Sequence, residues 1–216
     1  MTKAFLFDLD GVIVETAGFH YQAWRQLAND LGFDISEEFN EGLKGISRME
    51  SLDLILAHGN IELSEAKKLD LAKSKNDFYL TLVSQMTPND ILPGVQDFFR
   101  QIKQTDIKIG LGSVSKNAKM ILEKVGLLQE FDAIIDGNKI SRSKPDPEVF
   151  LSGATELGFL PTECIVFEDA VAGVEAGKRA GMKVVGIGKA EVLTKAEIIL
   201  AGFEGIELNA LLENLE

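Results

Sequence analysis

The chain lacks the marks of several protein classes. It has a single cysteine, Cys164, in 216 residues, so no disulfide can form within it. Cys164 begins the apolar run CIVFE, which favours a buried strand residue over a reactive thiol. No apolar stretch reaches the ~18 residues of a membrane span, and the first ten residues contain no long apolar segment of the signal-peptide kind. We therefore expect a cytoplasmic protein with no membrane partner.

Positive charge is also scarce. The 22 lysines and arginines are outnumbered by 34 acidic residues, which gives a net charge of −12 at pH 7. Proteins that bind nucleic acids or anionic membranes need a basic surface, so this balance argues against both partners but leaves room for a small basic pocket. With 45% hydrophobic and 26% charged residues, the composition is that of a globular protein. The length allows one domain, or a core with an inserted module.

What the chain does have is a set of five short apolar runs, separated by segments with helical spacing. Hydrophobic and polar residues alternate only weakly within the runs, which is typical of strands buried on both faces of a parallel sheet. Strands that alternate with helices predict an α/β fold with a doubly wound, Rossmann-like parallel sheet. The predicted strands are 4–10, 107–113, 131–137, 164–170 and 182–188, and the intervening helices fall within 95–104, 117–127, 147–158 and 171–181.

One segment breaks this alternation. Residues 16 to about 86 contain several helix patterns and no convincing strand, and a linker with two prolines, 87–94, follows them. We therefore predict a core of residues 1–15 and 88–216 with an inserted helical domain of residues 16–87. Its helices are expected at 19–32, at 47–59 after a capping box of Ser47 and Glu50, and at 64–86 as one long helix or a pair.

The run FLFDLDGVIV, residues 5–14, places two aspartates at the end of the first predicted strand. In a parallel sheet, ligands bind at the carboxyl ends of the strands. Asp8 and Asp10 lie at such an end, and the run CIVFEDA places Glu168 and Asp169 at another. Four carboxylates at one edge would repel each other unless a cation neutralised them, and oxygen ligands suit Mg²⁺. An aspartate–glycine turn on its own would be an ordinary strand-to-loop junction.

Two further residues extend this pattern along the chain. Ser113 ends a predicted strand in GLGSVS, and Lys144 lies in the loop SRSKPDPEVF before a helix. Each alone could be a plain loop or cap residue. Together, a lysine and a serine could hold the oxygens of a phosphoryl group while a carboxylate attacks its phosphorus.

These four motifs, DLDG, Ser113, KPDP with Lys144, and EDA, resemble those of the haloacid dehalogenase superfamily of phosphotransferases. The resemblance implies that Asp8 is the nucleophile that becomes an aspartyl phosphate and that Asp10 is a general acid and base. It also implies a Mg²⁺ site of Asp8, Asp10, Glu168 and Asp169, and an inserted helical domain that acts as a mobile cap.

The cap stretches TAGFHYQAW, KGISRMESL and KSKNDFY resemble those of the β-phosphoglucomutase branch of this superfamily. That resemblance implies a mutase that converts β-glucose 1-phosphate to glucose 6-phosphate through a bisphosphate. Thr16 and His20 would lie at the hinge, and Arg48 would grip the phosphate that is not transferred. The remaining expected substrate contacts are Gly45, Ser51 and Lys75 on the cap, and Ser115, Lys116 and Asn117 on the core.

Simpler interpretations stay open at this point. Arg48, His20 and Lys75 could be solvated or polar residues on helices. The same motifs would also serve a sugar-phosphate phosphatase, or a binding module that has lost its activity. We expect a monomer that acts on a small sugar phosphate. One residue departs from the family pattern: Glu15 stands where aspartate is expected before the hinge threonine, which puts the closure rate in doubt.

Overall fold

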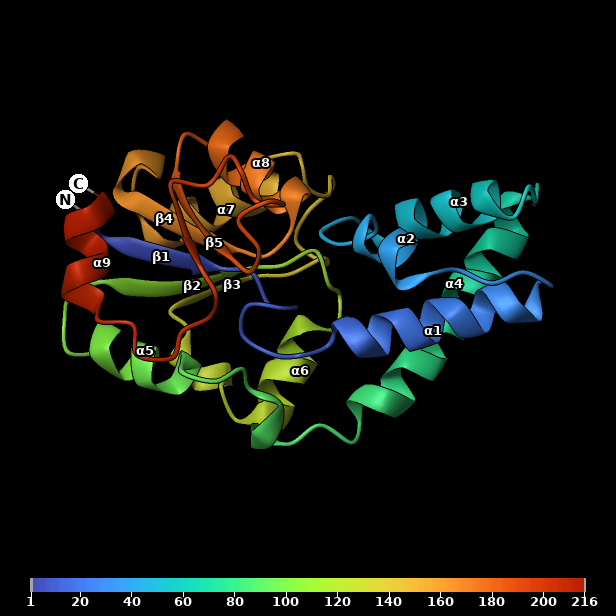
Figure 1. Ribbon diagram of the computed structural model, residues 1–216, viewed down its shortest axis with the longest axis horizontal. Coiled ribbons are helices and arrows are strands. Elements are labelled where there is room, and N and C mark those ends of the chain that lie inside the picture. The colour runs from blue at the N-terminus through green and yellow to red at the C-terminus, as the bar shows by residue number, and fades with distance from the viewer. Residues whose placement is uncertain (1, 216) are drawn as a thin grey trace.

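In the computed structural model, which describes residues 2–215, six parallel strands form one sheet (Figure 1). The order is β3-β2-β1-β4-β5-β6, and every neighbouring pair is parallel. The doubly wound sheet is confirmed, with one short edge strand, β6, that was not predicted. The strands are β1 (Ala4–Phe7), β2 (Lys108–Gly112), β3 (Ala133–Ile135), β4 (Cys164–Glu168), β5 (Lys183–Ile187) and β6 (Ile198–Leu200).

Helices cover both faces of the sheet because alternate strand residues point to opposite sides. Phe5 and Phe7 pack in a core with α5 (Val95–Ile102), α6 (Ala118–Val125) and α9 (Leu208–Leu215). Ala4 and Leu6 pack on the other face with α7 (Glu148–Leu157) and α8 (Val171–Arg179). Three 3₁₀ turns lie in the connections, at Pro88–Asp90, Leu128–Glu130 and Pro161–Glu163.

The inserted segment is helical among its described residues, as predicted. It consists of α1 (Ala17–Asp30), α2 (Glu37–Glu41), α3 (Arg48–His58) and α4 (Glu65–Val83). These helices share their own hydrophobic core, built on residues such as Trp24, Leu52 and Ile55. The Ser47 and Glu50 capping box begins α3 as expected, whereas the short α2 was not predicted. The third predicted helix is one long element, α4.

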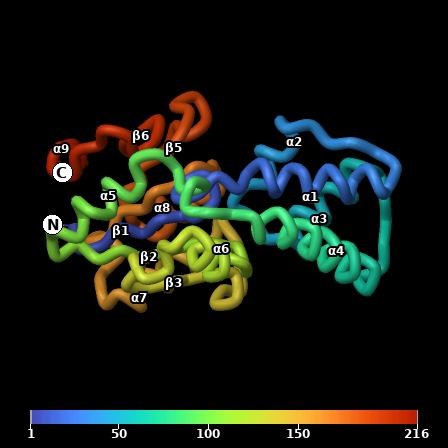
Figure 2. Tube along the Cα trace, turned by 90° about the horizontal axis from the view of Figure 1, so that it is seen from below, coloured from blue at the N-terminus to red at the C-terminus, as the bar shows by residue number. Residues whose placement is uncertain are grey.

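Two chain crossings join the helical segment to the sheet, and they run side by side. The Glu15 amide donates to the Asp90 carbonyl at 3.1 Å, and Val14 forms an isolated antiparallel bridge with Ile91. The strands point toward the helical segment, and both chain ends lie on the opposite side of the sheet (Figures 1 and 2). Among the described residues, none of the helices combines the length and apolar character that a membrane span needs.

Candidate active site

The predicted carboxylates meet at the carboxyl edge of the sheet, facing the helical segment. In the strand register, Phe7 of β1 pairs with Phe167 of β4, so the next residues, Asp8 and Glu168, are neighbours. The Asp8 amide donates to the Phe167 carbonyl at 3.0 Å, so the pairing of β1 with β4 holds the backbone of Asp8 in place. One carboxylate oxygen from each of Asp8, Glu168 and Asp169 lies within 4.8 Å of the others. The parallel topology therefore gathers residues that lie 160 positions apart in the chain.

Lys144 supplies the positive charge within this cluster. Its Nζ lies 2.5 Å from Oδ1 of Asp8 and also donates to Glu168. Burial alone would lower the pKa of Lys144, but the carboxylates of Asp8 and Glu168 outweigh burial and raise it, so the ammonium form is held. Lys144 is 1% exposed, which keeps this charge away from solvent screening.

The donor set fits a divalent cation. Three carboxylates offer hard oxygen ligands, which such ions prefer. Burial, together with the Asp8 charge, raises the pKa of both Glu168 and Asp169, and a bound cation would reverse that effect. Two glycines provide space for these carboxylates. A Cβ on Gly11 would lie 2.3 Å from Oδ2 of Asp169, and a Cβ on Gly173 would lie 1.8 Å from Oε1 of Glu168.

Asp10 lies outside that trio of oxygens. Its carboxylate accepts a hydrogen bond from the hydroxyl of the buried Thr16, and Nε2 of His20 lies 3.8 Å from its Oδ1. Burial and the neighbouring Asp8 charge raise the pKa of Asp10 to about 6. A carboxyl group with that pKa can hold or release a proton near neutral pH, as a general acid and base must.

On the core side, Ser113 is fully buried at the end of β2 and begins a loop with ordered turns. Its hydroxyl accepts from the Ser115 amide at 3.1 Å, and the Ser115 hydroxyl accepts from the Asn117 amide at 3.3 Å. The Asn117 side chain then donates to the Asn76 side chain of α4 at 3.0 Å. Lys116 lines the same cavity between the helical segment and the sheet. This loop therefore reaches from the sheet edge to the helical segment.

The helical segment closes the other wall of that cavity, which has a volume of about 900 Å³ and also opens onto Asp8 and Asp10. Arg48, the first residue of α3, lines it, as do Gly45 and Ser51. Lys75 of α4 is 4% exposed, with its Nζ 4.2 Å from the ring centre of Trp24. The structure thus brings the predicted cap residues to the same cavity as the carboxylates.

Three cations in this cavity have no carboxylate partner. Within residues 2–215, Arg48, Lys75 and Lys116 take part in no ion pair, whereas their neighbour Lys73 pairs with Asp77 at 2.6 Å. Burial and the Arg48 charge lower the pKa of Lys75 to about 7. Such a cluster of uncompensated positive charge is suited to an anion.

His20 links the two walls. Its Nδ1 lies 3.1 Å from Nζ of Lys75, and its ring packs against that of Tyr79 at a tilt of 35°, with the centres 4.2 Å apart. Burial, followed by the charges of Lys75 and Arg48, lowers the pKa of His20 well below its usual value. His20 is therefore neutral at pH 7, and it can accept a hydrogen bond from Lys75.

The contacts that cross between the helical segment and the sheet could not be predicted from the sequence. Glu50, expected only in a capping box, also accepts from the hydroxyl of Ser143, next to Lys144. Lys44 pairs with Asp169, and Asn76 pairs with Asn117. No local pattern marks such residues, because their partners lie far away in the chain.

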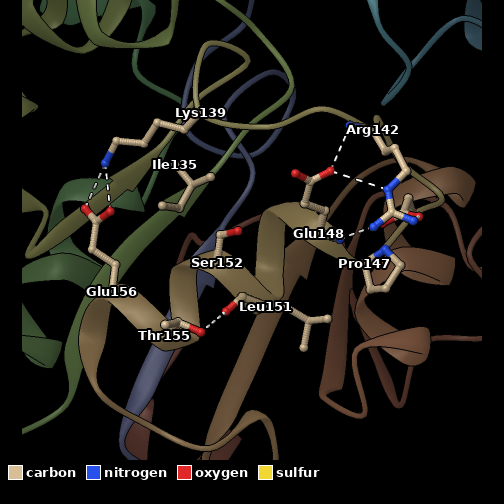
Figure 3. Close-up of a pocket in the computed structure, with 10 residues that line it drawn as sticks. Ile135, Lys139, Arg142, Pro147, Glu148, Leu151, Ser152, Thr155 and Glu156 are labelled. Carbon is tan, nitrogen blue, oxygen red and sulfur yellow. Dashed lines mark hydrogen bonds and ion pairs between the residues drawn. The ribbon is translucent and has the colours of Figure 1, made fainter.

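A separate surface cavity of about 700 Å³ lies beside α7 (Figure 3). Its charges are paired internally: Lys139 with Glu156, and Arg142 with Asp146 and Glu148. Glu148 also accepts from the amides of Ser141 at 3.0 Å and Arg142 at 2.8 Å. Each charged residue that lines this cavity is thus already paired. Glu148, in addition, holds the loop that carries Lys144 in place through these two amide hydrogen bonds.

Comparisons with known proteins agree with this geometry. Residues 2–181 match the model of the haloacid dehalogenase-like hydrolase family. The chain is 41% identical to β-phosphoglucomutase of Bacillus subtilis, covering 99% of this chain and 96% of that one. It is 29% identical to the phosphorylated carbohydrates phosphatase of Thermotoga maritima, covering 84% and 82%. The crystal structure of β-phosphoglucomutase from Clostridium difficile superposes with a TM-score of 0.96 at 46% identity, covering 99% and 97%. The chain belongs to the haloacid dehalogenase-like hydrolase family.

Proposed function

We propose that this protein is a β-phosphoglucomutase, an isomerase that interconverts β-D-glucose 1-phosphate and glucose 6-phosphate. The likeness to β-phosphoglucomutases over the whole chain supports this assignment. The observation that carries it within the structure is the cavity of about 900 Å³, which has Asp8 and Asp10 on one wall and the unpaired Arg48 and Lys75 on the other. A bisphosphorylated sugar presents an anionic group to each wall.

The chemistry follows from Asp8 and Asp10. An oxygen of Asp8 attacks the phosphorus, the bond from phosphorus to the sugar oxygen breaks, and Asp10 donates a proton to that oxygen. In the return step, Asp10 takes a proton from the sugar hydroxyl that attacks the aspartyl phosphate. Transfer to the opposite end of a glucose monophosphate gives β-glucose 1,6-bisphosphate, and a second transfer after reorientation gives the product. The pKa of about 6 for Asp10 suits both directions.

We assign the divalent cation as Mg²⁺, held by Asp8, Glu168 and Asp169, with Asp10 still a predicted ligand. A bound Mg²⁺ would supply charge stabilisation to the phosphoryl oxygens next to Asp8. The ammonium group of Lys144 and the hydroxyl of Ser113 provide further donors at the same edge of the sheet. Lys144 also offsets the charge of Asp8 itself, which allows an anionic phosphate to approach.

The opposite wall holds the phosphate that is not transferred. We assign that role to Arg48, with Ser115, Lys116 and Asn117 contributing from the core. Arginine offers a planar pair of donors that matches a phosphate group. Gly45, Ser51 and Lys75 line the same wall as Arg48 and would contact the sugar.

We infer that residues 16–87 move as a cap domain against a core of residues 1–15 and 88–216. The support is the separate hydrophobic core of the helices and the pair of crossings at Glu15 and Asp90. Thr16 binds Asp10 at this hinge, so closure and the position of the acid–base carboxyl are linked. His20 bridges the hinge to Lys75. We expect a monomer, because the cap and core of one chain supply both walls.

A phosphatase of the same family is the second candidate, favoured by the similarity to the phosphorylated carbohydrates phosphatase. In that case water would attack the aspartyl phosphate in place of a sugar hydroxyl. The three unpaired cations favour the mutase, because water needs no anchor for a second phosphate.

The deciding experiment supplies the protein with β-glucose 1-phosphate, Mg²⁺ and a trace of β-glucose 1,6-bisphosphate. Glucose 6-phosphate and inorganic phosphate are then measured in the same samples. The mutase predicts isomer in large excess over phosphate, and phosphate without isomer would overturn it. The D8N variant is the control, because it is nearly isosteric but removes the nucleophile, so it should form neither product.

A further inference from the structure

Lys44 is a cap residue with an unexpected partner at the candidate metal site. It follows α2, and its Nζ lies 3.1 Å from Oδ2 of Asp169. The same Nζ lies 3.0 Å from Oε2 of Glu41, one turn earlier in the chain. Lys44 thus contacts two carboxylates at once, one in the core and one in the cap.

The two carboxylates differ in their surroundings. The side chain of Asp169 is 10% exposed, whereas that of Glu41 is 63% exposed. The pair with Asp169 is therefore screened less by solvent than the pair with Glu41. Glu41 remains available as an acceptor if Lys44 leaves Asp169, so release of Asp169 does not leave the ammonium group without a partner.

Lys44 also lies where two cavities meet. A cavity of about 410 Å³, lined in part by Gly11, Glu15 and Glu41, lies beside the larger one. Lys44 and Asp169 line both. A cation that approaches Asp169 through the smaller cavity therefore meets a wall that also carries the ammonium group of Lys44.

An ammonium ion and a divalent cation cannot both take full advantage of one carboxylate, because each neutralises the charge that attracts the other. We propose that Lys44 competes with the divalent cation for Asp169 and passes to Glu41 when the cation binds. Lys44 is thus a positioning residue that sets the metal affinity from the cap side. This inference rests on the metal site assigned under the proposed function.

The test is direct measurement of Mn²⁺ binding to the full-length protein, from the electron paramagnetic resonance signal of the free ion, with Mg²⁺ measured by competition. The K44M variant should bind Mn²⁺ about three- to fivefold more tightly, the range of a partly screened ion pair. K189M is the matched control: Lys189 lines the smaller cavity and pairs with no carboxylate among residues 2–215. It should stay within twofold of the wild type.

The E41Q variant distinguishes exchange of partners from a general effect of charge. With Glu41 neutralised, Lys44 depends on Asp169 alone, so E41Q should weaken Mn²⁺ binding. In the K44M background, the same change should have little effect. Equal effects of E41Q in both backgrounds, or an unchanged affinity in K44M, would overturn the proposal.

The binding measurement needs no sugar phosphate, so it can fail independently of the assigned reaction. Unchanged metal affinity in K44M together with an active isomerase would overturn the role of Lys44 alone. The expected shifts together with an inactive isomerase would overturn the assigned reaction alone.

Discussion

Lys144 and Asp8 form a buried ion pair, with 2.5 Å between Nζ and Oδ1, although they lie 136 positions apart in the chain. Lys144 also donates to Glu168, so one ammonium group serves two carboxylates at the ends of β1 and β4. Asp8 could not sit beside Glu168 in a dry site without such a partner. The ion pair therefore stabilises the fold and also supplies the counter-charge of the Asp8 carboxylate, the proposed nucleophile.

The K144M variant should lose stability, because it leaves two buried carboxylates without their counter-charge. Removing one partner of a buried pair typically costs about 3–5 kcal/mol. Mg²⁺ should restore part of this loss by binding the same carboxylates. Urea denaturation in EDTA and in excess Mg²⁺ measures both effects. A loss of the same size under the two conditions would show that the cation does not replace the lysine charge.

Glu148 should matter for turnover although it lies outside the cavity of Asp8. Its carboxylate accepts from the amides of Ser141 and Arg142, and so fixes the loop that carries Lys144. Figure 3 shows Glu148 beside Arg142. A misplacement of about 1 Å can cost up to about a hundredfold in rate. We expect E148A to lower kcat at least tenfold, by the same reasoning. E156A, on the same helix but paired with Lys139, should stay near the wild type. Equal rates for the two variants would contradict this role.

Lys75 should make stability depend on pH above neutrality. Its pKa is about 7 in the folded protein and 10.5 when exposed, so the unfolded chain binds more protons between these values. Stability contributed through Lys75 therefore rises with pH in that window, by up to about 1.4 kcal/mol per pH unit. Relative to the wild type, K75M should be most stabilised at pH 7, and that advantage should shrink steadily as the pH rises toward 10.5, as urea midpoints would show. Parallel pH curves for the two proteins would rule this out.

Much of the sheet could be predicted from the sequence because buried parallel strands leave continuous apolar runs, such as the one that ends at Asp8. The edge strand β6, Ile198–Leu200, was missed although its residues are apolar, because three residues are too few to mark a strand by their pattern. The short α2 was also missed: five residues are too few to show a helical period.

The residues of the candidate site also fall into those that could be predicted from the sequence and those that could not. Asp8 and Glu168 stand at the ends of β1 and β4, where topology alone brings them together. Lys44 and Asn76 could not be predicted, since each contacts the core only through the placement of the cap. Lys75 was expected in the cavity, but its burial against Trp24 and the resulting low pKa depend on packing.

In the proposed reaction, the phosphoryl group on Asp8 passes to a sugar that is held by its other phosphate. Arg48 is the residue that distinguishes this from hydrolysis, because it lines the cavity from the cap and has no carboxylate partner within residues 2–215. R25A is the matched control: Arg25 is a cap arginine that pairs with Asp34 at 2.8 Å on the exposed surface.

The most direct measurement compares two rates in the same preparations of wild type, R48A and R25A. One is the isomerisation of β-glucose 1-phosphate, and the other is the hydrolysis of enzyme phosphorylated with acetyl phosphate. R48A should lose about ten- to a hundredfold in isomerisation, the loss expected for a charged hydrogen bond to phosphate. Its hydrolysis rate should stay within about twofold, since water needs no anchor, and R25A should match the wild type in both. If R48A isomerised as fast as the wild type, or if both of its rates fell together, Arg48 would not be the anchor of the second phosphate.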